Sequence, residues 1–133
     1  KSCQHSIKAV MPKLRAVGFA VAGLEAEIMG YAPKLSSEKL AHRLSLDLRQ
    51  IDMFEINEAF ASQAFAVRRD LGLDPGRVNI YGGGISIGHP IGATGCVLAV
   101  KVLYELARTD KRDAMISMCI GGGQGISMYF SKC

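Results

Sequence analysis

Alternating apolar positions mark the first element of the chain. Over residues 14–23, the side chains of Val17, Phe19 and Val21 occupy every second position, with smaller residues between them. A period of two places such side chains on one face of an extended strand, so the pattern predicts a β-strand here. Short apolar runs predict four further strands, at residues 51–56, 78–81, 114–120 and 126–130.

Three segments between these strands carry helical signals. Residues 35–46 begin with serines followed by an acid, which is typical of a helix start. Residues 58–71 form an amphipathic pattern that ends near Gly72, with Asn57 placed as its N-cap. Residues 95–108 are rich in Val, Leu and Ala and predict a buried helix. The order β-α-β-α-β-α-β-β indicates an α/β fold with a mixed central sheet flanked by helices.

The composition fits one ordered domain of 133 residues, with residues 1–13 as a polar tail or the end of a truncated helix. The chain is 49% hydrophobic and 21% charged, a composition that indicates an ordered globular protein instead of a disordered tail of a larger one. Its formal charge of +4 favours anionic partners, but it has no nucleic-acid recognition motif and only 7% aromatic residues. We therefore expect no nucleic-acid partner. No apolar run approaches the roughly 20 residues that span a bilayer.

The cysteines and histidines predict neither a disulfide framework nor a metal site. The four cysteines form no CxxC pair, and the three histidines lack ligand spacing with one another or with the cysteines. Cys96 opens the predicted buried helix, so we expect it in the core. Unpaired cysteines favour a reducing compartment. The expected location is intracellular, in the cytoplasm, with the mitochondrion and the peroxisome left open.

Three polar residues lie in unusual loops and are candidates for chemistry. Asn57 follows a predicted strand, His89 lies between a glycine and a proline, and Cys119 ends an apolar strand before three glycines. Each also has a structural interpretation, respectively an N-cap, a loop histidine bonded to a carbonyl, and a buried inert cysteine. The glycines after Cys119 can present successive N–H groups to an oxyanion. The glycine-rich segment 82–95 lacks a phosphate-loop motif, which leaves phosphate binding with little support.

The three candidates carry more weight together than singly. Ligands of α/β sheets bind at the carboxyl ends of strands. Asn57 and Cys119 each follow or end a predicted strand, and His89 lies in the loop after a third. An amide, an imidazole and a thiol at one edge of a sheet can hold an anion and move a proton. We therefore expect these side chains to converge.

Three sequence motifs resemble those of the C-terminal domain of the thiolase family. In chain order they are Asn57-Glu58-Ala59-Phe60-Ala61, the segment GGGISIGHPIGATG at residues 82–95, and Cys119-Ile120-Gly121-Gly122-Gly123. The resemblance covers nearly the whole chain after residue 13 and implies a thiolase-like α/β domain. Residues 32–37 depart from the family pattern, which leaves the shape of the nearby pocket open.

The resemblance implies chemistry on acyl-coenzyme A. In this family a cysteine of the N-terminal half takes the acyl group as a thioester. His89 would activate that nucleophile and help bind the thioester oxygen of the second substrate, and Asn57 would hold a water that completes this oxyanion site. Cys119 would be the acid/base at the substrate α-carbon. The backbone N–H of Gly121 would support the oxyanion of the acyl-enzyme.

The resemblance also implies a pocket and partners. Met29 and Phe60 would line the acyl and pantetheine pocket, with coenzyme A as a substrate and no cofactor. Because the nucleophile-bearing half is not among these residues, we expect the chain alone to be inactive and to self-associate. With that half, it is expected to form a homo-oligomer, a dimer or tetramer. The rival interpretations are a ketoacyl synthase relative, disfavoured because those enzymes usually carry a second histidine where Cys119 stands, and a non-catalytic thiolase-like module for assembly or regulation.

Overall fold

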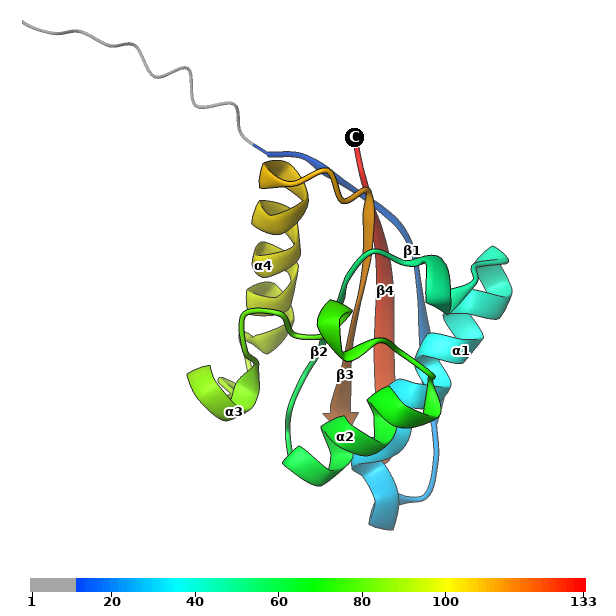
Figure 1. Ribbon diagram of the computed structural model, residues 1–133. Helices are drawn as coiled ribbons and strands as arrows, with labels where there is room; N and C mark the ends of the chain where they lie inside the picture. The colour runs from blue at the N-terminus through cyan, green and yellow to red at the C-terminus, as the bar shows by residue number, and fades with distance from the viewer. Residues whose placement is uncertain (1–11) are drawn as a thin grey trace, which may run out of the picture.

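The computed structural model describes residues 12–133, so most of the predicted N-terminal tail lies outside the described residues. Four strands and four α-helices make up the domain (Figure 1). In chain order the elements are β1 (Leu14–Gly23), α1 (Ala32–Leu44), β2 (Phe54–Ile56), α2 (Ala61–Asp70), α3 (Gly84–Ile87), α4 (Thr94–Arg108), β3 (Asp113–Gly121) and β4 (Gln124–Lys132). Short 3-10 turns lie at η1 (Ala26–Tyr31), η2 (Leu48–Gln50) and η3 (Pro75–Arg77).

The strands form one mixed sheet in the order β1-β4-β3-β2. β4 lies antiparallel to both of its neighbours, whereas β2 lies parallel to β3. The predicted α/β fold with a mixed sheet is therefore confirmed. Because β2 and β3 are parallel, their carboxyl ends lie at the same edge of the sheet.

Helices cover both faces of the sheet and create two apolar clusters. On one face, Leu40 of α1 and Val67 of α2 pack with Ile56 and Met115 of the sheet. On the other face, α4 packs against the sheet alone, and its core includes Val102 (Figure 1). Alternate residues of each strand supply the two clusters, as the pleat requires.

The alternation in β1 marks the strand correctly, but its large side chains face away from the main core. Gly18 and Ala20 lie on the face toward α1, where a Cβ on Gly18 would come within 3.3 Å of Leu44. The opposite face carries Val17, Phe19 and Val21, which are exposed. Small residues therefore let α1 approach β1, and the large apolar residues are left on the α4 side of the sheet.

Two predictions at the β2 edge were wrong, the N-cap of α2 and the strand at residues 78–81. Helix α2 begins at Ala61, and its N-cap is Phe60 instead of Asn57. The backbone N–H of Asn57 donates to Ser117 O across 2.9 Å, which continues the pairing of β2 with β3. Residues 78–81 form only isolated bridges and no strand, because Asn79 takes the left-handed conformation with φ 49°.

The predicted buried helix is half exposed. Helix α4 occupies Thr94–Arg108, close to the predicted range, and buries Leu98, Val102 and Leu106. Val100 and Tyr104 lie on its exposed side, and Cys96 is also exposed, so the prediction that Cys96 belongs to the core was wrong. Apolar composition alone did not distinguish a helix covered on both sides from one covered on a single side.

Candidate active site

Asn57 lies buried at the carboxyl end of β2, with 2% of its surface exposed. Its backbone is held to β3 through Ser117, so the side chain leaves the sheet in a fixed direction. The amide Nδ2 lies 3.4 Å from Nε2 and 3.5 Å from Nδ1 of His89. The structure thus brings the first two predicted site residues into contact.

A threonine at the start of α4 holds the imidazole of His89. Nδ1 of His89 lies 2.6 Å from Oγ1 of Thr94, and that hydroxyl donates to the carbonyl of Pro90 at 3.1 Å. A hydroxyl has a single proton to donate, so with that proton directed at Pro90, Nδ1 is the donor to Thr94. The lone pair therefore resides on Nε2, which is the arrangement a proton acceptor needs.

The loop that carries His89 packs directly on the segment that follows β2. A Cβ on Gly84 would lie 2.9 Å from Glu58 O and 3.3 Å from Asn57 Oδ1, and one on Gly83 would lie 2.6 Å from the Glu58 carboxylate. Two adjacent glycines permit this close approach. The Asn57-Glu58 motif and the glycine-rich motif are therefore one packed unit.

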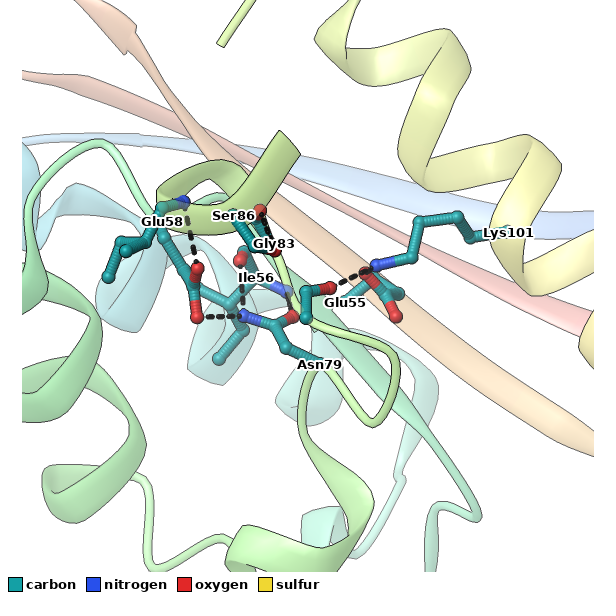
Figure 2. Close-up of polar contacts among 9 residues, drawn as sticks. Glu55, Ile56, Glu58, Asn79, Gly83, Ser86 and Lys101 are labelled. Carbon is teal, nitrogen blue, oxygen red and sulfur yellow. Dashed lines mark hydrogen bonds and ion pairs between the residues drawn. The ribbon is translucent and has the colours of Figure 1, made fainter. Parts of the chain in front are cut away.

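Glu58 connects this loop to the chain before it. Its Oε2 accepts from Ile85 N at 3.1 Å, at the start of α3, and its Oε1 accepts from Asn79 Nδ2 at 3.1 Å (Figure 2). The Asn79 amide also pairs with both backbone groups of Ile56, across 2.8 and 2.9 Å. One side chain thus replaces a neighbouring strand along the outer edge of β2.

Cys119 lies near the carboxyl end of β3, beside the strand that presents Asn57. Ser117, whose carbonyl accepts from Asn57 N, precedes Cys119 by two positions, so strand alternation puts Cys119 on the α1 face of β3, opposite to the face toward α4. The Cys119 thiol is free and half-buried. Parallel pairing therefore places Cys119 at the same end of the sheet as Asn57, and the contacts of the described residues join Asn57 to His89 but not to Cys119.

Gly121 is the last residue of β3, directly before the tight turn to β4. It has φ +88°, and Gly122 and Gly123 also have positive φ. A Cβ on Gly123 would come within 2.2 Å of Leu24 O, so the hairpin closes against the chain that follows β1. Gly121 itself is exposed, and its Cβ would meet nothing within 4 Å.

The predicted pocket residues lie on two adjoining elements. Met29 belongs to η1 and is 39% exposed, and Phe60 caps α2 and is 61% exposed. The two elements touch, since a Cβ on Gly30 would lie 2.9 Å from Cγ of Gln63. Both side chains are thus open to solvent near the Asn57 segment.

Sequence reasoning missed Thr94 and the bracing role of Glu58. Thr94 had one usable signal, because a hydroxyl residue shortly after the histidine and at a helix start can reach back into the loop. Glu58 had none, since its partners Asn79 and Ile85 are brought to it only by the tertiary fold.

Comparisons with known proteins decide the family. Residues 10–132 match the family model described as thiolase, C-terminal domain. The chain belongs to the thiolase family. Among curated relatives, the chain is 46% identical over 125 residues to a beta-ketothiolase of Cupriavidus necator and 42% identical over 125 residues to an acetyl-CoA acetyltransferase of Paracoccus denitrificans. Each alignment covers 94% of this chain and 32% of the relative.

A solved thiolase structure shares the fold. The crystal structure of the Bacillus anthracis acetyl-CoA acetyltransferase matches with a TM-score of 0.88 and 39% identity, covering 90% of this chain and 30% of that one. The chain therefore spans about a third of the length of the thiolase relatives it matches. Within residues 12–133, no helix is long and apolar enough to cross a membrane.

Proposed function

We propose that this thiolase domain supplies the acid/base half of an acyl-transfer site, which works with a nucleophilic cysteine on an N-terminal half. The reaction is acyl transfer between acyl-CoA and CoA, as a Claisen condensation or its thiolytic reverse. The observation that carries the proposal is the chain of contacts from Asn57 to His89 to Thr94, which leaves Nε2 of His89 as an acceptor at the edge that also presents Cys119.

In the condensation direction each group has one task. Nε2 of His89 takes the proton of the nucleophilic thiol, and the resulting thiolate attacks the thioester carbon of the first acyl-CoA. The new thioester forms as the C–S bond to CoA breaks, and the leaving CoA thiolate takes the proton of Cys119. Cys119, as thiolate, removes a proton from the α-carbon of the second acyl-CoA. The resulting carbanion attacks the thioester carbon, so a C–C bond forms while the C–S bond breaks and the nucleophile leaves as thiolate.

Oxyanion stabilisation falls to Asn57, His89 and Gly121. Asn57 holds a water that, with His89, binds the thioester oxygen of the second substrate, and the N–H of Gly121 faces the oxygen of the acyl-enzyme. A preorganised donor of this kind typically contributes on the order of 3 kcal/mol. Met29 and Phe60 flank the acyl and pantetheine arm, which their exposure beside the Asn57 segment supports.

An uncovered apolar surface supports the need for a partner half. On the α4 side of the sheet, an apolar groove of about 250 Å³ runs between α4 and β3–β4, bordered by Ala99, Met118 and Phe130. Val17 and Phe19 of β1 face the same side, so much of this face lacks a covering helix. An N-terminal half covers it, and the complete enzyme assembles as a homo-oligomer.

Reconstitution tests the function. The chain is co-expressed with the N-terminal part of the Paracoccus denitrificans acetyltransferase, and thiolysis of acetoacetyl-CoA is measured for the purified pair. Activity is expected for the pair and not for the chain alone. His89→Ala or Cys119→Ala in the pair should abolish turnover, and normal rates in either variant would refute the assigned roles. A folded, associated pair without activity would instead favour the non-catalytic module.

A further inference from the structure

A second buried carboxylate lies below the site, outside the roles assigned above. Glu55 is fully buried on β2, and an ion pair joins it to Lys101 of α4 (Figure 2). Its neighbours Phe54 and Ile56 belong to the cluster under α1 and α2, so Glu55 faces α4 instead. Asn57 follows two positions later and shares that face of the strand.

A gain in folding stability does not explain the buried ion pair between Glu55 and Lys101. Burial raises the pKa of the Glu55 carboxyl, against the opposing effect of the hydrogen bond from Lys101. Oε1 of Glu55 has no hydrogen-bond partner among the described residues. Replacing a buried ion pair by apolar residues of similar size is often neutral or stabilising. The geometry of the contacts, and not their energy, points to a role.

Lys101 joins three elements through one ammonium group. Besides Glu55 on β2, Nζ donates to the carbonyl of Gly82 at 2.6 Å, at the start of the loop that carries His89. Gly82 has φ +77°, a conformation that favours glycine. On α4, Thr94 lies about two turns before Lys101, which places both on one helix face.

Each of these elements carries one member of the hydrogen-bonded trio of the site. β2 presents Asn57, the loop presents His89, and α4 presents Thr94. The contacts within the trio are set by the relative placement of the three elements. Among residues 12–133, the Lys101 ammonium on α4 is the one group that bonds both to β2 and to the loop.

We propose that Lys101 is a positioning residue, which holds the His89 ring between Asn57 and Thr94 by tying β2 and the loop start to α4. Its effect on turnover rests on the proposed function, whereas its effect on the geometry of His89 does not. The compact, strongly hydrated ammonium suits this role because it accommodates a carboxylate and a carbonyl at once.

The test follows the imidazole of His89 directly. In the full chain labelled at histidine, nitrogen–proton NMR reports the tautomer, and His89→Gln assigns the signals. Wild type is expected to show a single tautomer with the proton on Nδ1. Lys101→Met removes the ammonium and keeps an unbranched apolar stem, and should give averaged tautomers or a second set of His89 signals. In the reconstituted pair, the same variant should lower kcat on the order of 10²-fold with little change in KM.

A matched control comes from the far end of α4. Lys111 pairs with the buried Glu105 at 2.7 Å, so Lys111→Met removes the lysine partner of another buried glutamate away from the site. This variant should leave the His89 signals and kcat as in wild type. If both variants alter His89 alike, the effect is general loosening of the domain and the proposal fails.

A second variant covers the case in which Lys101→Met does not fold because Glu55 is left unpaired. The double variant Glu55→Gln, Lys101→Met removes both charges and leaves no unpaired ion. Averaged His89 tautomers in this folded variant support the proposal, and wild-type signals overturn it. If the wild-type reconstituted pair is inactive while Lys101→Met still disturbs His89 in the chain, the proposed function is refuted and the positioning role stands.

Discussion

Nδ1 of His89 lies 2.6 Å from Thr94 Oγ1, and the direction of this hydrogen bond decides which ring nitrogen can accept a proton. The Thr94 hydroxyl is itself committed to the carbonyl of Pro90. The donor and acceptor roles of the two His89 ring nitrogens therefore depend on Thr94, the first residue of α4. Substitutions there should change the chemistry of the ring without removing the ring.

Thr94→Val should remove the acceptor for Nδ1 while nearly keeping the side-chain volume. The neutral imidazole would then populate both tautomers, and kcat of the reconstituted pair should fall on the order of 10-fold or more. Thr94→Ser keeps the hydroxyl and serves as the control, with a rate close to wild type. Equal rates for the valine and serine variants would show that the hydroxyl does not orient His89.

Gly84→Ala should disturb the packing between the His89 loop and the Asn57 segment. The added methyl would lie 2.9 Å from Glu58 O, so backbone must move. We expect a loss of about 1–3 kcal/mol in the free energy of unfolding, measured by urea denaturation. Gly92→Ala is the control in the same loop, since its Cβ would meet nothing within 4 Å. A similar loss in both variants would contradict the close-approach argument.

The raised pKa of Tyr129 predicts that the folded chain loses stability at high pH. Its hydroxyl is buried and donates to Asp113 Oδ2 at 2.9 Å, and burial followed by this hydrogen bond raises the pKa of Tyr129 to about 12 from 10.0. A folded pKa above the unfolded value favours folding below pH 10, and this contribution is lost as the pH rises to about 12. Its full size is on the order of 2–3 kcal/mol.

Urea denaturation at a series of pH values checks this prediction. Tyr129→Phe has no phenol to ionise, so its stability should decline less steeply between pH 10 and 12 than that of wild type. Lysines titrate over the same range in both proteins, and the difference between the two curves isolates Tyr129. Parallel curves would show that the phenol ionises as freely in the folded chain as in the unfolded one.

Phe19→Lys should reduce self-association of the chain. Phe19 is 54% exposed on the uncovered face of β1, beside Val17 and Val21. Phe65→Lys is the matched control, since Phe65 is 55% exposed on α2, which covers the other face of the sheet. Sedimentation equilibrium should show a shift toward monomer only for the Phe19 variant. Association that is insensitive to Phe19 would place the contact elsewhere.

The sequence predicted the strands and helices where local pattern and tertiary packing agree. β1, α4 and the last two strands fall close to their predicted ranges. Two of the errors lie where an asparagine side chain makes tertiary contacts that local propensity does not show. Asn57 was assigned to cap a helix by propensity, but the helix begins at Ala61 and the Asn57 amide lies against His89. Asn79 lies in an apparent strand, yet φ 49° and its amide contacts leave no room for one there.

The contact between Asn57 and His89 was predictable from the sequence, but the residues that brace it were not. The strand ends and glycine-rich motifs were visible in the chain and pointed to Asn57, His89 and Cys119. The braces around them were not, because Glu58, Thr94 and Lys101 acquire their partners only when distant segments meet. In a sequence, a charged or hydroxyl side chain has many possible hydrogen-bond partners. The fold selects which of them it contacts.

The pairing of Asn79 with Ile56 has a consequence for how the domain avoids aggregation. β2 is the edge strand of the sheet beside β3, and Asn79 occupies both hydrogen-bonding groups of Ile56. An open strand edge is a template on which another chain can add a strand. Because the Asn79 amide occupies these groups, another molecule cannot pair with β2 at Ile56. The edge strand next to the candidate catalytic residues is therefore protected from strand addition.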